Sequence, residues 1–276
     1  MYRQEVQRRR NQTYNDVQAR LPKSASRAVI SHVTAMKLYG ADAPESLKLS
    51  NEKIHVTVPL EKQKFSHMGD VVYHSWSHEM WAVDYEGLNV MAPEPLVAQM
   101  ARFMHVGELV ELASVLCCRD KKFRVTSVEQ IRQYALRTHK FHGRRTLLEA
   151  LKCMPDNTDS PQEAAVMFWL VSEGNLPKPE VNHKVTDTQG TMYIDLAYVK
   201  ERLAIEYQGE HHFRGKYPRL DVERYKRLQA LGWEVVYVTA DDLRSSKAIS
   251  QLIARIQILL QQRSSIAYLL GQEVAC

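Results

Sequence analysis

Two short segments around residue 200 restrict the possible folds of this chain more than any other feature. Residues 192–198 and 203–208 have the length of strands and are rich in apolar and aromatic side chains. Segments of this kind, separated by a short polar stretch, indicate adjacent strands joined by a tight turn around Lys200-Glu201. The sequence therefore predicts a hairpin within a larger sheet.

The predicted hairpin would bring acidic and amide side chains together. Because side chains alternate between the faces of a strand, Glu206 and Gln208 should share one face, with Ile205 and Tyr207 in a core on the other. The turn would place Asp195 beside Glu206. Converging carboxylates repel each other, so a fold that gathers them usually holds a cation between them. Oxygen ligands suit Mg²⁺ or Mn²⁺, the ions commonly used to hydrolyse a phosphodiester.

The segments on either side of the hairpin have the order of an α/β domain. Ser160 and Pro161 are typical first residues of a helix, which places Glu163 in its first turn. Around the hairpin we expect a helix, a strand, a second helix, a buried strand and a closing helix, over residues 160–172, 180–185, 220–230, 233–238 and 247–270. This order predicts a three-layer α/β domain with a mixed central sheet.

Several separate motifs in residues 160–243 resemble one family. In chain order they are Ser160-Pro161-x-Glu163, Asp195 after an apolar residue, Ala204-Ile205-Glu206-Tyr207-x-Gly209-x-x-His212, Asp221-x-x-Arg224, and Leu231-Gly232-Trp233-x-Val235-Val236 leading to Thr239-Ala240-Asp241-Asp242-Leu243. Together they resemble the small endonuclease-like domain akin to the very-short-patch-repair nucleases, in the PD-(D/E)xK superfamily. The resemblance implies a restriction-endonuclease-like fold and a Mg²⁺- or Mn²⁺-dependent endonuclease.

The resemblance also implies roles for individual residues. Asp195 and Glu206 would be metal ligands, and Glu163 would face them from its helix and hold a metal-bound water. His212, just beyond the second strand, would help to deprotonate the attacking water. Each acid has a simpler alternative, which is an ion pair with Lys200 or Arg202 for the strand carboxylates and favourable helix-end charge for Glu163.

Two departures from the family pattern leave a second function open. Gln208 belongs to the expected catalytic set but stands where the superfamily has lysine, and Met167 stands where relatives usually have arginine. Without that lysine, His211, His212 or a second metal ion would have to activate the water. The alternative is a nuclease fold that no longer cuts and acts as a nucleic-acid-binding regulator, such as an antitoxin-like repressor.

A polar stretch with a proline, 155–159, is expected to separate two domains, 1–154 and 155–276. Before it we expect helices over 4–20 and 28–38, strands near 54–58, 70–74, 81–84 and 88–90, and helices through 93–151. This order indicates an α+β domain. Four features of this half are the motif Ser31-His32-Val33-Thr34-Ala35, Gly40, the strand over 54–58 and the basic helix ending His142-Gly143-Arg144-Arg145. They are similar to the AbiEi-like regulator region that often precedes the nuclease domain.

Positive charge is concentrated in the middle of the chain. Residues 119–145 carry nine Lys or Arg and two Asp or Glu, while the whole chain has a net charge of +5. Basic clusters beside an acidic metal site would bind a phosphate backbone, and we expect contacts from Arg144, Arg145 and, in the second domain, Arg224. DNA is the expected partner and RNA the alternative. A simpler arrangement is that the basic cluster forms a solvated helix face and that Arg224 pairs with Asp221.

The composition gives further expectations about surroundings and partners. No segment approaches the roughly 20 apolar residues that span a bilayer, and the charged start of the chain lacks the pattern of a signal peptide. The four cysteines show no C-x-x-C spacing and are expected to be reduced. We therefore expect a cytoplasmic protein with no membrane contact. The apolar face of residues 247–270 would pack on the sheet or form a homodimer.

Overall fold

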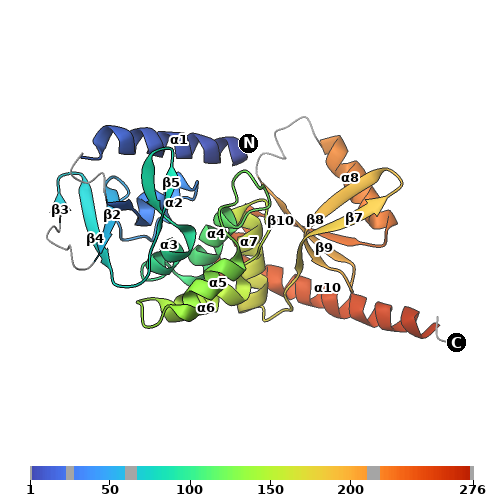
Figure 1. Cartoon of the computed structure of the whole chain (residues 1–276). Helices are drawn as coiled ribbons and strands as arrows, with labels where there is room; N and C mark the ends of the chain where they lie inside the picture. The colour runs from blue at the N-terminus through green and yellow to red at the C-terminus, as the bar shows by residue number, and fades with distance from the viewer. Residues whose placement is uncertain (1, 23–27, 60–66, 210–217, 274–276) are drawn as a thin grey trace. The chain divides into compact units, whose positions relative to one another are not determined.

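The computed structural model describes residues 2–22, 28–59, 67–209 and 218–273. The chain divides into two compact units, Met1–Asp156 and Asn157–Cys276. Each unit has its own sheet, and helices cover both sheets (Figure 1). The helices and mixed sheets confirm the expected α/β class.

The N-terminal unit is built on a mixed sheet with the strand order β3-β4-β2-β1-β6-β5. Its strands are β1 (Val29–Ile30), β2 (Ile54–Pro59), β3 (His67–Met68), β4 (Val71–Trp76), β5 (Ala82–Tyr85) and β6 (Leu88–Met91). The short β1 is central, because it pairs antiparallel with β2 and parallel with β6.

The expected helix over 28–38 is wrong at its start. Val29 and Ile30 form β1 instead, and helix α2 (His32–Leu38) begins only after Ser31. The physical reason is pairing, since Ile30 lies between Val56 of β2 and Val90 of β6 and is almost fully buried. Two β-branched residues suit this pleated, buried position better than a helix end.

Six helices belong to the described part of this unit: α1 (Tyr2–Arg20), α2, α3 (Pro93–Met100), α4 (Val106–Leu116), α5 (Val128–Arg137) and α6 (Arg144–Cys153). Two arginines of the sequence Arg8-Arg9-Arg10 help to attach the polar helix α1 to the rest of the unit. Arg9 donates to Gly40 O at 2.7 Å, and Arg10 donates to Leu38 O and to the Tyr85 hydroxyl, each at 3.0 Å. These two side chains therefore have structural partners within the unit.

The C-terminal unit has the strand order β10-β9-β8-β7, with β10 parallel to β9 and the other pairs antiparallel. Its strands are β7 (Glu180–Asp187), β8 (Gly190–Tyr198), β9 (Leu203–Gln208) and β10 (Glu234–Thr239). Its helices are α7 (Pro161–Phe168), the π-helical turn η3 (Trp169–Glu173), α8 (Pro218–Ala230), α9 (Ala240–Leu243) and α10 (Ser246–Glu273).

Helices cover both faces of this second sheet, which confirms the three-layer expectation (Figure 1). On one face Met167 of α7 and Leu252 of α10 pack with Ile205, and Tyr207 lies against the same cluster. On the other face Leu228 of α8 packs with Ala204. The apolar stripe of α10 therefore covers the sheet. No helix in the described ranges combines the length and the apolar character needed to span a bilayer.

Candidate functional site

Asp195 and Glu206 lie on adjacent antiparallel strands, at the point where the ladder between β8 and β9 stops. Leu196 pairs with Ile205, so Asp195 and Glu206 are the next residues along the two strands. Here a side chain replaces the backbone partner, because Tyr207 N donates to Asp195 Oδ2 at 3.0 Å. This hydrogen bond fixes Asp195 against β9. Its donor, Tyr207, directly follows Glu206 in the strand.

Glu206 is almost fully buried and is held by an arginine of α8. Arg224 Nη1 donates to Oε2 at 2.6 Å and Nη2 donates to Oε1 at 2.9 Å, which is the two-pronged arrangement typical of arginine and carboxylate. Arg224 Nη2 also donates to Tyr193 O of β8. The guanidinium thus joins α8 to both central strands and supplies positive charge beside Glu206.

Glu163 is held at the first turn of α7. Ser160 is the N-cap, as expected, because its Oγ accepts from Glu163 N at 3.3 Å. The carboxylate of Glu163 accepts from Ser160 Oγ at 2.8 Å and from Asp159 N at 2.9 Å. Its two oxygens therefore accept from the hydroxyl of the N-cap residue and from the backbone N–H of the residue before it. Glu163 is nevertheless only 7% exposed, which is unusual for a residue that only caps a helix.

The three acids form one electrostatic group, which we call the carboxylate cluster: Glu163, Asp195 and Glu206. Burial, and then the charge of Asp195, raises the pKa of Glu163 to about 8. The same two causes raise the pKa of Glu206 to about 7, although Arg224 opposes them. The charge of Asp195 thus raises the pKa of Glu163, which belongs to α7, and the pKa of Glu206, which is bound to Arg224 of α8. Crowded, partly desolvated carboxylates of this kind are typical of functional sites.

The fit of this cluster to a metal ion is partial. Hard oxygen donors are the right ligands for Mg²⁺ or Mn²⁺. Within the described residues, however, no group of three or more His, Cys, Asp or Glu side chains is arranged to hold a metal ion. Glu206 is engaged by Arg224, and Glu163 by the helix cap. Asp195 and Glu206 could share a cation once Arg224 releases Glu206.

The other expected residues of this site lie at or beyond the end of β9. Gln208 is half-buried and pairs with Thr239 of β10. His211 and His212 lie outside the described residues, as does the side chain of Asp221. The catalytic role of His212 and the pairing of Arg224 with Asp221 therefore stay predictions.

The two expected phosphate contacts in the N-terminal unit differ in their surroundings. Arg144 Nε donates to Ala135 O at 3.2 Å and to Thr138 O at 3.3 Å, and so closes the end of α5. Arg145 is exposed. Arg144 therefore has a structural role whatever it binds, whereas Arg145 is presented to solvent.

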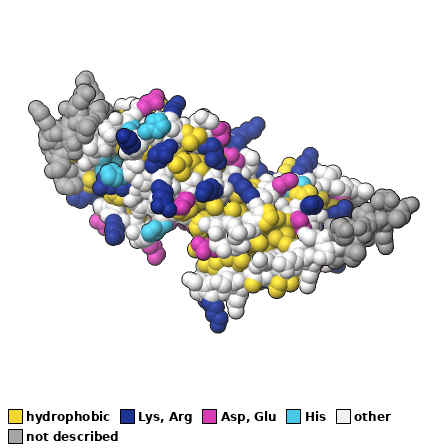
Figure 2. Space-filling model, turned by 90° about the horizontal axis from the view of Figure 1, so that it is seen from below, with side chains coloured by type: hydrophobic (Ala, Val, Ile, Leu, Met, Phe, Trp, Pro, Cys, Tyr) yellow, Lys and Arg dark blue, Asp and Glu magenta, His cyan; other side chains and the backbone are white. Residues whose placement is uncertain are grey.

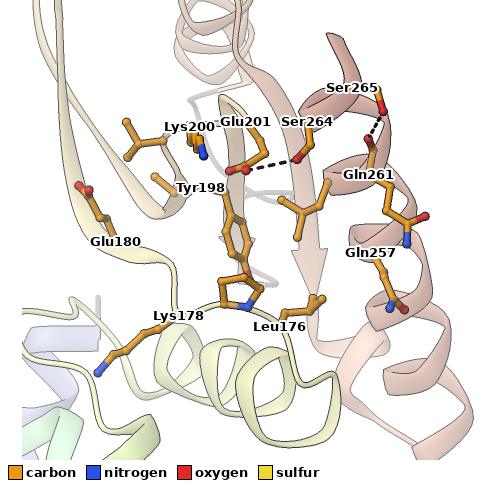
Figure 3. Close-up of a pocket in the computed structure, with 14 residues that line it drawn as sticks. Leu176, Lys178, Glu180, Tyr198, Lys200, Glu201, Gln257, Gln261, Ser264 and Ser265 are labelled. Atoms are coloured by element: carbon orange, nitrogen blue, oxygen red, sulfur yellow. Dashed lines mark hydrogen bonds between the residues drawn. The ribbon is translucent and has the colours of Figure 1, made fainter. Parts of the chain in front are cut away.

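The C-terminal unit also contains a hollow beside the turn between β8 and β9, at the end of the hairpin away from Asp195 and Glu206. It has a volume of about 1010 Å³ and is lined by the turn after β8, the segment after η3 and one side of α10 (Figure 3). Glu201 accepts from Ser264 Oγ at 3.3 Å, and among described residues the buried Tyr198 hydroxyl has no hydrogen-bond partner. None of the carboxylate cluster lines it, so its size does not make it the candidate site.

The partner of Glu206 in the structure, Arg224, differs from the partners that the sequence indicates. The sequence indicates phosphate or Asp221 as the partner of Arg224, and Lys200 or Arg202 as the partner of Glu206. Arg202 instead donates to Leu231 O at 3.0 Å. The Asp-x-x-Arg spacing within α8 does not indicate which strand carboxylate Arg224 faces.

Comparisons with known proteins give relatives without an assigned activity. No family model and no solved structure matches the chain. The chain is 32% identical over 119 residues to the uncharacterized protein MT2308 of Mycobacterium tuberculosis (strain CDC 1551 / Oshkosh), covering 41% of this chain and 43% of the relative. The uncharacterized protein Rv2248 of strain ATCC 25618 / H37Rv matches to the same extent. The chain thus spans less than half of the length of the curated relatives it matches.

Proposed function

We propose that the C-terminal unit hydrolyses phosphodiester bonds in DNA with the help of Mg²⁺ or Mn²⁺. The observation that supports this most directly is the carboxylate cluster. Two of its acids have pKa values raised towards neutrality by burial and by Asp195, at the end of a sheet whose motifs resemble a nuclease family. A protein without a use for them has little reason to bury Glu163 and Glu206 beside a third carboxylate, Asp195.

Each residue would contribute a separate part of the chemistry. Asp195 and Glu206 would hold the metal ion, which supplies an activated water and neutralises charge that develops on the phosphate. Arg224 would leave Glu206 and remain close enough to bind a phosphate oxygen, since guanidinium pairs equally well with phosphate. Gln208 would orient the substrate or water by hydrogen bonding, and His212 would accept a proton.

The partner and location belong to the same proposal. Exposed basic residues such as Arg145 would attract DNA to the chain, because phosphate binding depends on positive charge. We place the protein in the cytoplasm, where thiols stay reduced, and Cys117, Cys118 and Cys153 are free cysteines. A homodimer through α10 would have to use the part of that helix not occupied by the sheet, where Ile258 is 54% exposed.

The proposal is tested by a cleavage assay on the full chain. Plasmid, single-stranded DNA and RNA are incubated with the protein in Mg²⁺, Mn²⁺ or EDTA. We expect cleavage of DNA that requires the metal and is lost in Asp195→Asn. Glu234→Gln, which changes an exposed acid at the start of β10, is the matched control and should cut like the parent. Equal cleavage by Asp195→Asn, or none by the parent on any substrate, would refute the proposal.

One observation favours the second function, a nucleic-acid-binding regulator that does not cut. Arg224 already neutralises Glu206 with two short hydrogen bonds, and Glu163 is used in a helix cap. Such a cluster could persist as a structural ion pair. This alternative predicts tight DNA binding that EDTA does not change and no cleavage of any of the three substrates.

A further inference from the structure

The N-terminal unit contains a hollow that the proposed nuclease activity does not use. It has a volume of about 450 Å³. It lies where α2, the end of β4, the end of α3 and the segment before α6 meet, and we call it the histidine pocket because four of its lining residues are His32, His74, His78 and His142. The volume is at the small end of the range of about 300–1,000 Å³ for ligand pockets, which suits one small molecule and not a duplex.

The charged side chains at this pocket are positive. Arg102 and Lys140 line it and are exposed, and no Asp or Glu is among its lining residues. Arg102 also lies over the ring of Phe103, with 5.5 Å between the guanidinium carbon and the ring centroid. On the face shown in Figure 2, histidine side chains lie among Lys and Arg side chains on the N-terminal unit. A rim of this kind attracts an anion.

A residue with a buried acceptor lines the same pocket. Gln99 lines it and is 2% exposed, and its Nε2 donates to Thr57 Oγ1 at 3.2 Å. Thr57 in turn donates to Ser31 Oγ at 2.8 Å, and Ser31 Oγ lies 2.9 Å from His32 Nδ1, so Gln99 belongs to a chain of buried polar groups. Gln99 Oε1 is left without a partner among the described residues. An unsatisfied buried acceptor is costly, and a ligand N–H would remove that cost.

Three histidine rings pack together here, and two of them, His32 and His74, line the pocket. His32 stacks on His74 with 3.7 Å between ring centroids. His55 Nε2 donates to Ser50 O at 2.8 Å, so its neutral ring accepts from His74 Nε2 at 2.8 Å. Burial, with the neighbouring rings, holds the pKa of His32 well below its usual range, and burial also lowers the pKa of His55. Burial thus favours the neutral form of the His32 and His55 rings.

Further aromatic rings line the other side. Trp76 lies edge-to-face with His78, with 5.0 Å between centroids, and Phe141 lies 5.9 Å from Trp76. Trp76 is also fixed by its Nε1, which donates to the Tyr134 hydroxyl at 3.2 Å. A hollow with aromatic walls, a cationic rim and a buried acceptor matches the parts of a nucleotide: a flat base with N–H donors, attached to a phosphate.

We propose that the histidine pocket binds one nucleotide. Its phosphate would lie at Arg102 and Lys140, and its base would enter among the rings and donate to Gln99 Oε1. The nucleotide could be a free nucleoside monophosphate or the 5′-phosphorylated end of a single strand, since the two share this chemistry. The proposal rests on residues of the N-terminal unit and does not depend on the carboxylate cluster.

Isothermal titration of the full chain tests this proposal. The probes are adenosine 5′-monophosphate, adenosine, inorganic phosphate, and a short single-stranded oligonucleotide with and without a 5′-phosphate. We expect adenosine 5′-monophosphate or the phosphorylated oligonucleotide to bind about tenfold or more tightly than adenosine or phosphate alone. Whichever of the two binds more tightly identifies the source of the nucleotide.

Variants that change the charge of lining residues decide whether nucleotide binding takes place in the histidine pocket. Arg102→Glu and Lys140→Gln change exposed side chains and should weaken binding about tenfold or more, whereas Lys48→Glu, an exposed lysine that does not line the pocket, should bind like the parent. Asp195→Asn should also bind like the parent, which separates this result from the fate of the nuclease proposal. No binding of any phosphorylated probe up to about 10 mM, or unchanged binding in both pocket variants, would overturn the proposal.

Discussion

Arg224 is the side chain that distinguishes the two functions proposed for the C-terminal unit. A buried carboxylate beside another carboxylate needs positive charge, and in this structure a guanidinium supplies it to Glu206. A metal ion would supply the same charge and compete with Arg224 for the same oxygens. An enzyme therefore requires the arginine to move, whereas a regulator requires it to stay.

Removing this arginine should destabilise the protein in a way that depends on pH. In Arg224→Ala, Glu206 would remain buried without its partner, and loss of one partner of a buried pair costs on the order of 3 kcal/mol. The loss in free energy of unfolding should be smaller at pH 5.5 than at pH 8, because Glu206, with a pKa of about 7, can then be protonated. Urea unfolding at both pH values measures it. The double variant with Glu206→Gln should regain most of the loss, and equal losses in single and double variants would contradict the pairing.

The raised pKa values of Glu163 and Glu206 also predict how stability changes with pH. Their ordinary pKa is about 4.3, so between about pH 4.5 and 8 the folded state binds more protons than the unfolded state. Their contribution is complete below about pH 4.5 and is lost as the pH rises through 7 and 8. Asp195→Asn should reduce this loss because it removes the charge that raises both pKa values.

The measurement is the free energy of unfolding from urea titrations at pH 5, 6, 7 and 8, for the parent and for Asp195→Asn. The buried His32 and His55, whose pKa values are lowered, contribute in the opposite direction. Their effect is common to both proteins and cancels in the difference. Parallel curves for parent and variant would show that Asp195 does not act on the other two acids.

At the scale of elements, local patterns predict the structure where neighbours in sequence decide it. Ser160 and Pro161 are sufficient to place the start of α7, and the alternation in β9 places Ile205 and Tyr207 in one core. The failure at Val29–Ile30 has the opposite cause. A two-residue strand has no periodicity, and its conformation is decided by β2 and β6, which are far away in sequence.

The cap of α7 can be tested by itself. Ser160→Ala removes both the acceptor for Glu163 N and the donor to Glu163 Oε1, and should lower the free energy of unfolding by about 1 kcal/mol, within a usual range of about 0.5–2. Ser160→Asp keeps an acceptor but adds negative charge next to Glu163. It should therefore lower the free energy of unfolding more than the same Ser→Asp change at an N-cap that has no neighbouring acid. Thermal and urea unfolding measure both. An unchanged free energy of unfolding in Ser160→Ala would mean that this N-cap contributes nothing to stability.

At the scale of the whole molecule, the sequence is least informative about sites assembled from distant segments. The carboxylate cluster could be predicted because Asp195 and Glu206 belong to one hairpin. The histidine pocket could not, because His32, His74, Gln99 and Phe141 come from four separate segments with no common spacing. Their isolated histidines have the pattern of ordinary surface or core residues, and only tertiary packing brings them together.

DNA binding by the full chain separates the enzyme from the regulator. A non-specific nuclease should bind random DNA and its own promoter alike, with affinity that falls steeply between about 50 and 200 mM salt. Arg145→Ala should weaken all sequences alike and flatten the slope of log K against log salt by about 0.9, the effect of one lost phosphate contact on duplex DNA. Arg145 is the informative choice, since Arg144→Ala would also open the end of α5.

A repressor should instead prefer one operator by about 10³-fold or more, and EDTA should not change its binding. Promoter-specific, EDTA-insensitive binding without cleavage would therefore leave Arg224 as a permanent partner of Glu206 and make the C-terminal unit a binding domain on a nuclease-like fold.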